Sequence, residues 1–107
     1  VSYIVPHGTY CILGGTADDN DWNLEIDPKT SEEILRKCRE LDPRLNEVEI
    51  LGERVGLRPG RTEVRLELEH FSNDLLIIHN YGHGGAGFTL SWGCAEEVLR
   101  YAESVCE

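Results

Sequence analysis

The 107-residue sequence is poor in basic residues, and this shortage excludes two classes of partner. Ten lysines and arginines stand against 20 aspartates and glutamates, so the formal net charge is -10 and the isoelectric point is near 4.7. Proteins that bind phosphate backbones or anionic membrane surfaces use clustered Lys and Arg side chains for the purpose. We therefore expect no nucleic acid and no membrane among the partners.

Long apolar runs and closely spaced cysteines are missing as well. No stretch of 18 apolar residues could span a bilayer, and the N-terminus lacks the basic-then-apolar layout of a signal peptide. The cysteines, at positions 11, 38, 94 and 106, form no C-x-x-C pair, so no metal site is expected. Their wide spacing favours four reduced thiols, with disulfides as the alternative.

The pattern of apolar residues predicts an α+β fold with more strands than helices. Alternation and apolar runs indicate strands at residues 3–6, 10–13, 47–56, 63–69 and 75–79, the last of them covered on both faces. The capping box Thr30-Ser31-Glu32-Glu33 opens a helix that buries Ile34, Leu35, Cys38 and Leu41 and stops at Asp42-Pro43. A polar, acidic loop spans residues 14–28.

A second helix is predicted from about Thr89 to Val105, with a glycine-rich turn in front of it. The apolar face of this helix carries the side chains expected to be buried: Leu90, Cys94, Val98, Leu99, Ala102 and Val105. Gly82, Gly84 and Gly87 spell G-x-G-x-x-G, but no second parallel strand with an acidic residue follows the helix, as a dinucleotide-binding unit requires. No Lys-Ser or Lys-Thr pair follows either, which excludes a P-loop.

The start of this helix carries an unusual charge pattern. Residues 89–95 include no acidic side chain, although Asp and Glu are favoured at helix N-termini and the chain is strongly acidic. Three glycines in front of it leave backbone N–H groups uncovered, which suits an external anion or an electron-rich oxygen. A plain strand-to-helix turn explains the pattern equally well. His79 and His83 are expected to be ordinary hydrogen-bonded histidines.

The segment IIHNYGHGGAG at residues 77–87, followed by Gly93-Cys94-Ala95, closely resembles the signature of the D-amino-acid oxidase and D-aspartate oxidase family, which is FAD-dependent. Further stretches resemble family landmarks in the family's order: YIVP at 3–6, LGGT at 13–16, DWN at 21–23 and GERVGLRP at 52–59. The resemblance therefore extends over almost the whole chain.

This resemblance implies that the chain is the C-terminal third of a longer enzyme. Residues 1–70 would be the C-terminal part of the substrate-binding domain, with a mixed or antiparallel sheet. Residues 71–107 would be the last strand and helix of an FAD-binding domain, which is incomplete without an upstream segment of the same enzyme. FAD is then the implied cofactor, and a homo-oligomer is possible on this view.

The resemblance also assigns residues. Arg58 matches the arginine that grips the substrate α-carboxylate, and Tyr3 the tyrosine whose hydroxyl assists it; Gly85 matches the residue whose carbonyl receives the substrate amine. The implied cofactor-binding set is Arg58, Gly84, Gly85, Gly87, Phe88 and Thr89. No side chain is assigned as an acid or base. Ala86 departs from the aromatic residue expected in mammalian members, so different local packing beside the flavin is expected.

The implied reaction is oxidative deamination of a D-amino acid by oxygen, giving a 2-oxo acid, ammonia and hydrogen peroxide. Ala17-Asp18-Asp19 stands where D-aspartate oxidases are expected to carry an extra arginine, so a neutral substrate is favoured and D-aspartate is the alternative. A stand-alone, non-catalytic binding module is a third possibility. Family members are often peroxisomal; the last residues, Ser104 to Glu107, form no peroxisomal tripeptide, which leaves a cytoplasmic location open.

Overall fold

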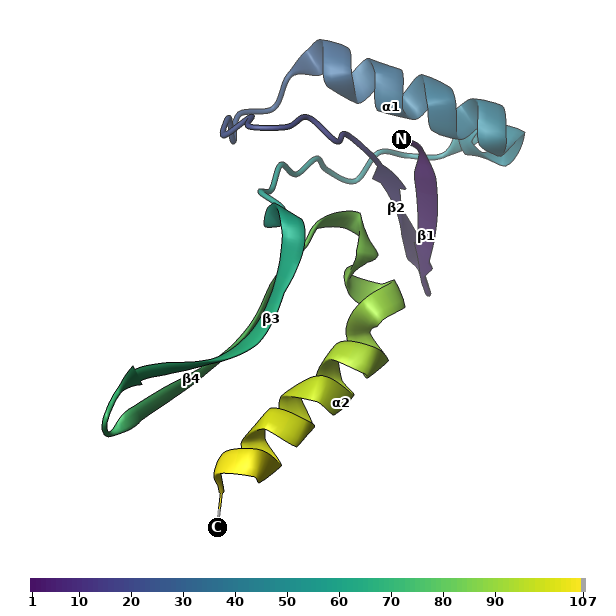
Figure 1. Cartoon of the computed structure of the whole chain (residues 1–107). Helices are drawn as coiled ribbons and strands as arrows, with labels where there is room; N and C mark the ends of the chain where they lie inside the picture. The colour runs from purple at the N-terminus through teal and green to yellow at the C-terminus, as the bar shows by residue number, and fades with distance from the viewer. Residues whose placement is uncertain (107) are drawn as a thin grey trace. The chain divides into compact units, whose positions relative to one another are not determined.

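The computed structural model describes residues 1–106 and has an α+β fold with two helices and two small antiparallel sheets (Figure 1). The chain divides into two compact units, Val1–Leu57 and a second one that begins at Arg58. The fold class expected from the apolar pattern is confirmed. All four cysteines are free thiols, and Cys38 and Cys94 are buried.

The first unit begins with a hairpin whose two strands were both predicted. β1 (Tyr3–His7) pairs antiparallel with β2 (Tyr10–Gly14), in a register that places Tyr3 opposite Gly14. Gly8 in the connecting turn has φ of +67°, a left-handed conformation that glycine adopts without a steric cost. The rings of His7 and Tyr10 stack at the end of the ladder with their centroids 5.5 Å apart.

Helix α1 (Pro28–Leu41) starts earlier than predicted, because another residue caps it. Asp27 is the N-cap: its Oδ2 accepts hydrogen bonds from the Thr30 backbone N–H at 3.2 Å and the Thr30 hydroxyl at 2.7 Å. Pro28 follows at the first helical position, where its missing N–H costs nothing. The predicted capping box at residues 30–33 is therefore wrong. An Asp is as good a cap as Ser or Thr, and the proline selects the earlier start.

Cys38 joins α1 to the hairpin. Its side chain is fully buried, and its Sγ donates to the backbone oxygens of Tyr3 at 3.5 Å and Gly14 at 3.6 Å. Ile34 and Leu35 are half-buried beside it, as expected, whereas Leu41 is 61% exposed at the end of the helix. The predicted apolar face is thus confirmed except at Leu41, which lies beyond the strands that the helix covers.

The strand predicted at residues 47–56 does not form. A 3-10 helix, η1 (Pro43–Glu47), follows α1 directly and includes the first predicted residue. From Val48 to Gly56 the chain has no regular structure and its side chains are exposed. A strand is stable only where another strand completes its backbone hydrogen bonds, and none within residues 1–106 pairs with this stretch.

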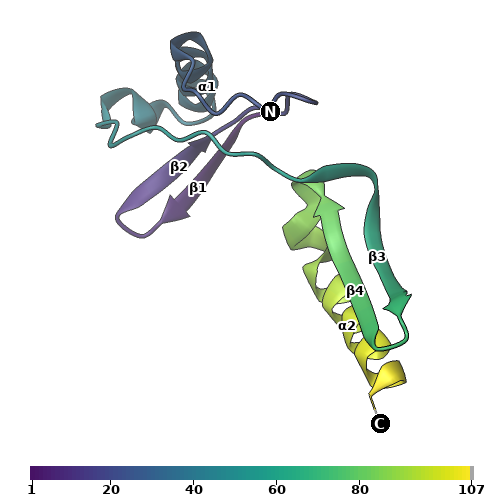
Figure 2. The same cartoon turned by 90° about the vertical axis from the view of Figure 1, so that its left-hand side faces the viewer.

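The second unit is a long hairpin with a helix packed along it, as Figure 2 shows. β3 (Gly60–Ser72) pairs antiparallel with β4 (Leu75–His83), and irregularities in the register lie between Gly60 and Arg65 and near the hairpin end. The strands predicted at 63–69 and 75–79 are confirmed, and both are longer. The second is not covered on both faces, because Leu75 and Leu76 are exposed.

Helix α2 (Gly87–Val105) confirms the second predicted helix and begins two residues earlier. Cys94 is buried, and the side chains of Val98, Ala102 and Val105 are half-buried. The Tyr101 hydroxyl donates to the Leu66 carbonyl of β3 at 3.5 Å. The expected burial of Leu90 and Leu99 is wrong; their side chains are 40% and 56% exposed.

Candidate functional site

The glycine turn lies between the end of β4 and the start of α2. A short 3-10 helix, η2 (Gly84–Ala86), makes the connection. Gly82 has φ of +86° and Gly84 has φ of +55°, so both adopt the left-handed conformation that a Cβ disfavours. Gly82 is also buried, and a Cβ there would lie 2.7 Å from Cδ of Arg61. Both glycines are thus required by the path of the backbone.

The first turn of α2 presents an uncompensated positive end. Its N-cap, Ala86, makes no side-chain capping bond, and no acidic residue lies in the first turn. The first four N–H groups of an α-helix have no partner inside the helix. A Cβ placed on Gly84, Gly85 or Gly87 would meet nothing within 4 Å. No side chain within residues 1–106 caps this helix end, and the three glycines face open space; a ligand at this turn stays a prediction.

The residues that follow Arg58 in the sequence are bonded to this turn. The carbonyl of Pro59, the next residue, accepts a hydrogen bond from the Gly84 N–H at 3.0 Å, and Gly60 pairs with His83 in the strand ladder. The Arg58 side chain is exposed, and within residues 1–106 it forms no ion pair. An arginine without a carboxylate partner in so acidic a chain is available to a carboxylate from outside.

Five of the predicted site residues therefore share one unit with Arg58, and one does not. Gly84 and Gly85 form η2, while Gly87, Phe88 and Thr89 are the first residues of α2. Phe88 is 100% exposed, so within residues 1–106 it has no packing role. Tyr3 belongs to the first unit, where its half-buried ring lies across the backbone of Gly14 and Gly15; a Cβ at Gly15 would lie 2.8 Å from the Tyr3 hydroxyl.

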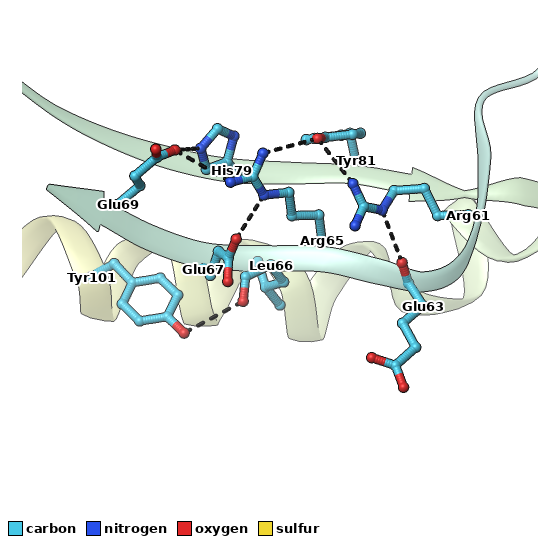
Figure 3. A network of polar contacts seen from close by, with 9 residues as sticks. All are labelled: Arg61, Glu63, Arg65, Leu66, Glu67, Glu69, His79, Tyr81 and Tyr101. Carbon is cyan, nitrogen blue, oxygen red and sulfur yellow. Dashed lines mark hydrogen bonds and ion pairs between the residues drawn. The ribbon is translucent and has the colours of Figure 1, made fainter. Parts of the chain in front are cut away.

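The analysis of the sequence missed a polar network on one face of the hairpin (Figure 3). Arg61 and Arg65 each donate from Nη1 to the hydroxyl of Tyr81 at 3.1 Å. The hydrogen bond from Arg65 holds the pKa of the Tyr81 phenol below its usual value. Arg65 also pairs with Glu67 and Glu69, and Glu69 Oε2 in turn contacts the His79 ring at 2.5 Å.

This network could have been found only with the register of the hairpin in hand. Alternation along residues 63–69 already placed Arg65 and the glutamates on one face. Tyr81 pairs with Arg65, and His79 with Glu67, across the ladder, which adds these side chains to the same face. The register depends on the two-residue turn at Asn73-Asp74, which the prediction did not use.

His83 and Cys94 form a second contact that the sequence did not reveal. Nε2 of His83 lies 3.4 Å from Sγ of Cys94, across the glycine turn. His79 and His83 are thus both hydrogen-bonded, as expected. Within residues 1–106 no three His, Cys, Asp or Glu side chains gather as metal ligands would, and no helix of that part is long and apolar enough to cross a membrane.

Comparison with known proteins identifies the family. The family model described as FAD dependent oxidoreductase matches residues 1–100. The chain belongs to this family. It is 56% identical to a D-amino-acid oxidase of Rubrobacter xylanophilus over 102 residues and 46% identical to one of Dictyostelium discoideum over 106 residues. These matches cover 95% and 96% of the chain but 31% of each relative. A human D-aspartate oxidase is 43% identical over 94% of the chain and 30% of its own length.

The turn fits the cofactor for which this FAD dependent oxidoreductase family is named. A flat ring can approach the backbone at Gly84, Gly85 and Gly87, because no side chain fills the space in front of them. The electron-rich oxygens of a flavin ring suit the free N–H groups of α2, where a protein carboxylate would compete and none is present in the first turn. The chain spans about a third of the length of the relatives it matches.

Proposed function

We propose that the chain is the C-terminal third of an FAD-dependent D-amino-acid oxidase that acts on neutral D-amino acids. The observation that carries the proposal is the hydrogen bond between the Gly84 N–H and the Pro59 carbonyl, 3.0 Å long. This bond ties the residue after Arg58 to the glycine turn. A carboxylate grip and a flavin-facing backbone would then lie side by side on one rigid hairpin.

In this proposal the protein binds and orients while the cofactor carries the redox chemistry. The Arg58 guanidinium would hold the substrate carboxylate with two parallel charge-assisted hydrogen bonds, which a lysine cannot reproduce. The family resemblance gives the Tyr3 hydroxyl, in the first unit, the role of a further hydrogen-bond donor to a substrate carboxylate. The Gly85 carbonyl would accept a hydrogen bond from the substrate amine. Bound FAD would supply the two-electron oxidation, so no acid–base side chain is required.

The positive end of α2 would contribute electrostatically. Gly87, Phe88 and Thr89 lie in its first turn, whose N–H groups would face the electron-rich edge of the ring. Preorganised N–H donors stabilise negative charge most effectively in a site from which water is excluded. Gly84 and Gly85 would let the ring approach closely, and Arg58 would border both the substrate and the cofactor.

We infer the preference for a neutral substrate from two negative charges in the first unit. Ala17, Asp18 and Asp19 are exposed in the loop after β2. Two carboxylates there would repel the second carboxylate of D-aspartate, whereas a neutral side chain would be unaffected.

The family's domain organisation is proposed as well. Residues 1–70 would complete a substrate-binding domain, and residues 71–107 would add the last strand and helix to an FAD-binding domain built by an upstream segment. Three large apolar side chains of α2, Phe88, Trp92 and Leu99, are exposed along one side of the helix and would be covered by that segment. A peroxisomal location, and assembly into a homo-oligomer, rest on the family resemblance alone.

The proposal is tested with a complete chain that carries this segment. Peroxide production with D-alanine should exceed that with D-aspartate, and the L-enantiomer of alanine should give none. No peroxide from any D-amino acid, with FAD bound, would refute the oxidase. A clear preference for D-aspartate would refute the assignment of a neutral substrate.

One substitution tests the proposed carboxylate grip. Arg58→Lys should lower kcat/KM for D-alanine by roughly 30- to 1,000-fold, since losing a bidentate, oriented contact costs about 2–4 kcal/mol. FAD content should not change. Arg44→Lys is the matched control, because the Arg44 side chain is 90% exposed and pairs with Asp42 of its own unit. A loss of less than about threefold for Arg58→Lys would show that another group holds the carboxylate.

A further inference from the structure

The contact between His83 and Cys94 joins the glycine turn to the helix that follows it. His83 ends β4, and Cys94 lies on the second turn of α2, eleven residues later. Their side chains meet at 3.4 Å between Nε2 and Sγ. Cys94 is buried and His83 half-buried, so water competes little for this contact. Either tautomer of the imidazole keeps it: Nε2 accepts the thiol proton, or the Nε2–H donates to the sulfur.

Within residues 1–106, three polar contacts hold the turn, and the one between His83 and Cys94 joins it to α2. The ladder pair of Gly60 with His83 and the hydrogen bond from the Gly84 N–H to Pro59 both fix the turn to β3. His83 stands between Gly82 and Gly84, which are left-handed, and Gly84 meets no atom within 4 Å of an added Cβ. Because η2 runs directly into α2 at Gly87, the contact between His83 and Cys94 adds a side-chain link between the end of β4 and the second turn of α2.

We propose that His83 and Cys94 are a positioning pair, which sets the angle between the η2 turn and the first turn of α2 and so shapes the face offered to the flavin. This inference rests on the proposed function for the identity of the ligand. The pair does not itself touch substrate or cofactor. Without this contact, the distance and angle between the N–H groups at the start of α2 and the Gly85 carbonyl would no longer be fixed. The proposed site needs both groups in place at the same time, the first for the flavin and the second for the substrate amine.

The first test needs no bound cofactor. In the complete chain without FAD, amide hydrogen exchange is compared between the wild type and His83→Leu, a substitution that removes the ring nitrogen and keeps much of the volume. Exchange of the Gly84 N–H, which is hydrogen-bonded to the Pro59 carbonyl, should accelerate by about three- to tenfold, as expected for one lost hydrogen bond. Exchange at residues 76–78 of β4 should not change. Equal acceleration in both places, or none at Gly84, would overturn the proposal.

The second test measures the cofactor. His83→Leu and Cys94→Ala should each weaken FAD binding by about three- to tenfold, and the double variant should be no weaker than the more affected single one, because both remove the same contact. His83→Gln, whose amide nitrogen can take the place of Nε2, should recover most of the affinity and the visible flavin spectrum. Additive losses in the double variant would show that the two residues act separately and would overturn the pair.

Matched controls separate this contact from general effects of the substitutions. His70→Leu and Cys106→Ala replace an exposed histidine and an exposed cysteine of the same unit, and both should behave as the wild type. Failure of the complete wild-type chain to bind FAD would refute the proposed function. The exchange experiment would still decide whether the pair holds the turn.

Discussion

Separated from any upstream segment, the 107-residue chain is expected to bind FAD only weakly. The first turn of α2 offers at most about four free N–H groups, each worth roughly 1 kcal/mol net as a hydrogen bond. Their sum, about 4 kcal/mol, corresponds to a Kd near 1 mM before any cost of ordering is subtracted. Within residues 1–106 there is no glycine-rich βαβ unit to hold the pyrophosphate and adenosine.

Fluorescence quenching of FAD on titration with the chain measures this affinity. Gly87→Asp puts a carboxylate at the start of α2, where it would compete for the same N–H groups and abolish the remaining binding. Gly56→Asp makes the same charge change at an exposed glycine of the other unit, with open space around it, and should have no effect. Submicromolar affinity requires more than about 8 kcal/mol, so finding it would refute the fragment hypothesis and place the whole flavin site in this chain.

Three further predictions concern stability and ionisation within the two units. Leu45→Ala should lower the free energy of unfolding by about 2–5 kcal/mol in urea titrations, because Leu45 is only 7% exposed, whereas Leu51→Ala, at a 75% exposed side chain, should change it by less than about 0.5 kcal/mol. The cap hydrogen bonds hold the pKa of Asp27 below its usual value of 3.8, so its stabilisation of α1 is complete above that pH and is lost as the pH falls through the lower folded-state pKa. Acid unfolding followed by circular dichroism should show this loss in the wild type and not in Asp27→Asn. Arg65→Leu should raise the pKa of Tyr81 towards 10.0 in a titration of phenolate absorbance, and an unchanged pKa would mean that Arg65 does not perturb the phenol.

The elements that could be predicted from the sequence are those with local causes. Alternation from residue 63 to 69 marks β3, and the 3.6-residue periodicity of Cys94, Val98, Ala102 and Val105 marks α2. The start of α1 was missed because two local signals competed. Asp27-Pro28 and Thr30-Ser31 both resemble a helix start, and the aspartate that precedes proline is the one used.

The errors share a non-local cause. Residues 48–56 have strand-like side chains, but whether they form a strand depends on a neighbour elsewhere in the chain. Leu90 and Leu99 are apolar at helical positions, yet their burial depends on what lies against that side of α2. Sequence periodicity states which residues could be buried together and does not supply the surface that buries them.

The features of the candidate site also differ in whether their causes are local or non-local in the sequence. The glycine turn and the missing acidic residues at the start of α2 are properties of consecutive residues, and both could be predicted. The bond between Pro59 and Gly84 joins residues 25 positions apart. It follows an irregularity in the ladder between Gly60 and Arg65, which no simple alternation pattern encodes.

In the proposed enzyme, helix α2 would connect cofactor binding to the stability of the upstream segment. Its N-terminus faces the proposed flavin site, while Phe88, Trp92 and Leu99 are 100%, 88% and 56% exposed along its side. Burying three such side chains is worth about 1.5–3 kcal/mol each, a sum comparable to the entire stability of a small domain. The segment that covers them would therefore hold the helix in place, and through His83 and Cys94 it would also hold the glycine turn. Trp92→Ala and Leu99→Ala, on the exposed side of α2 and outside the proposed cofactor-binding set, should accordingly weaken FAD binding in the complete enzyme.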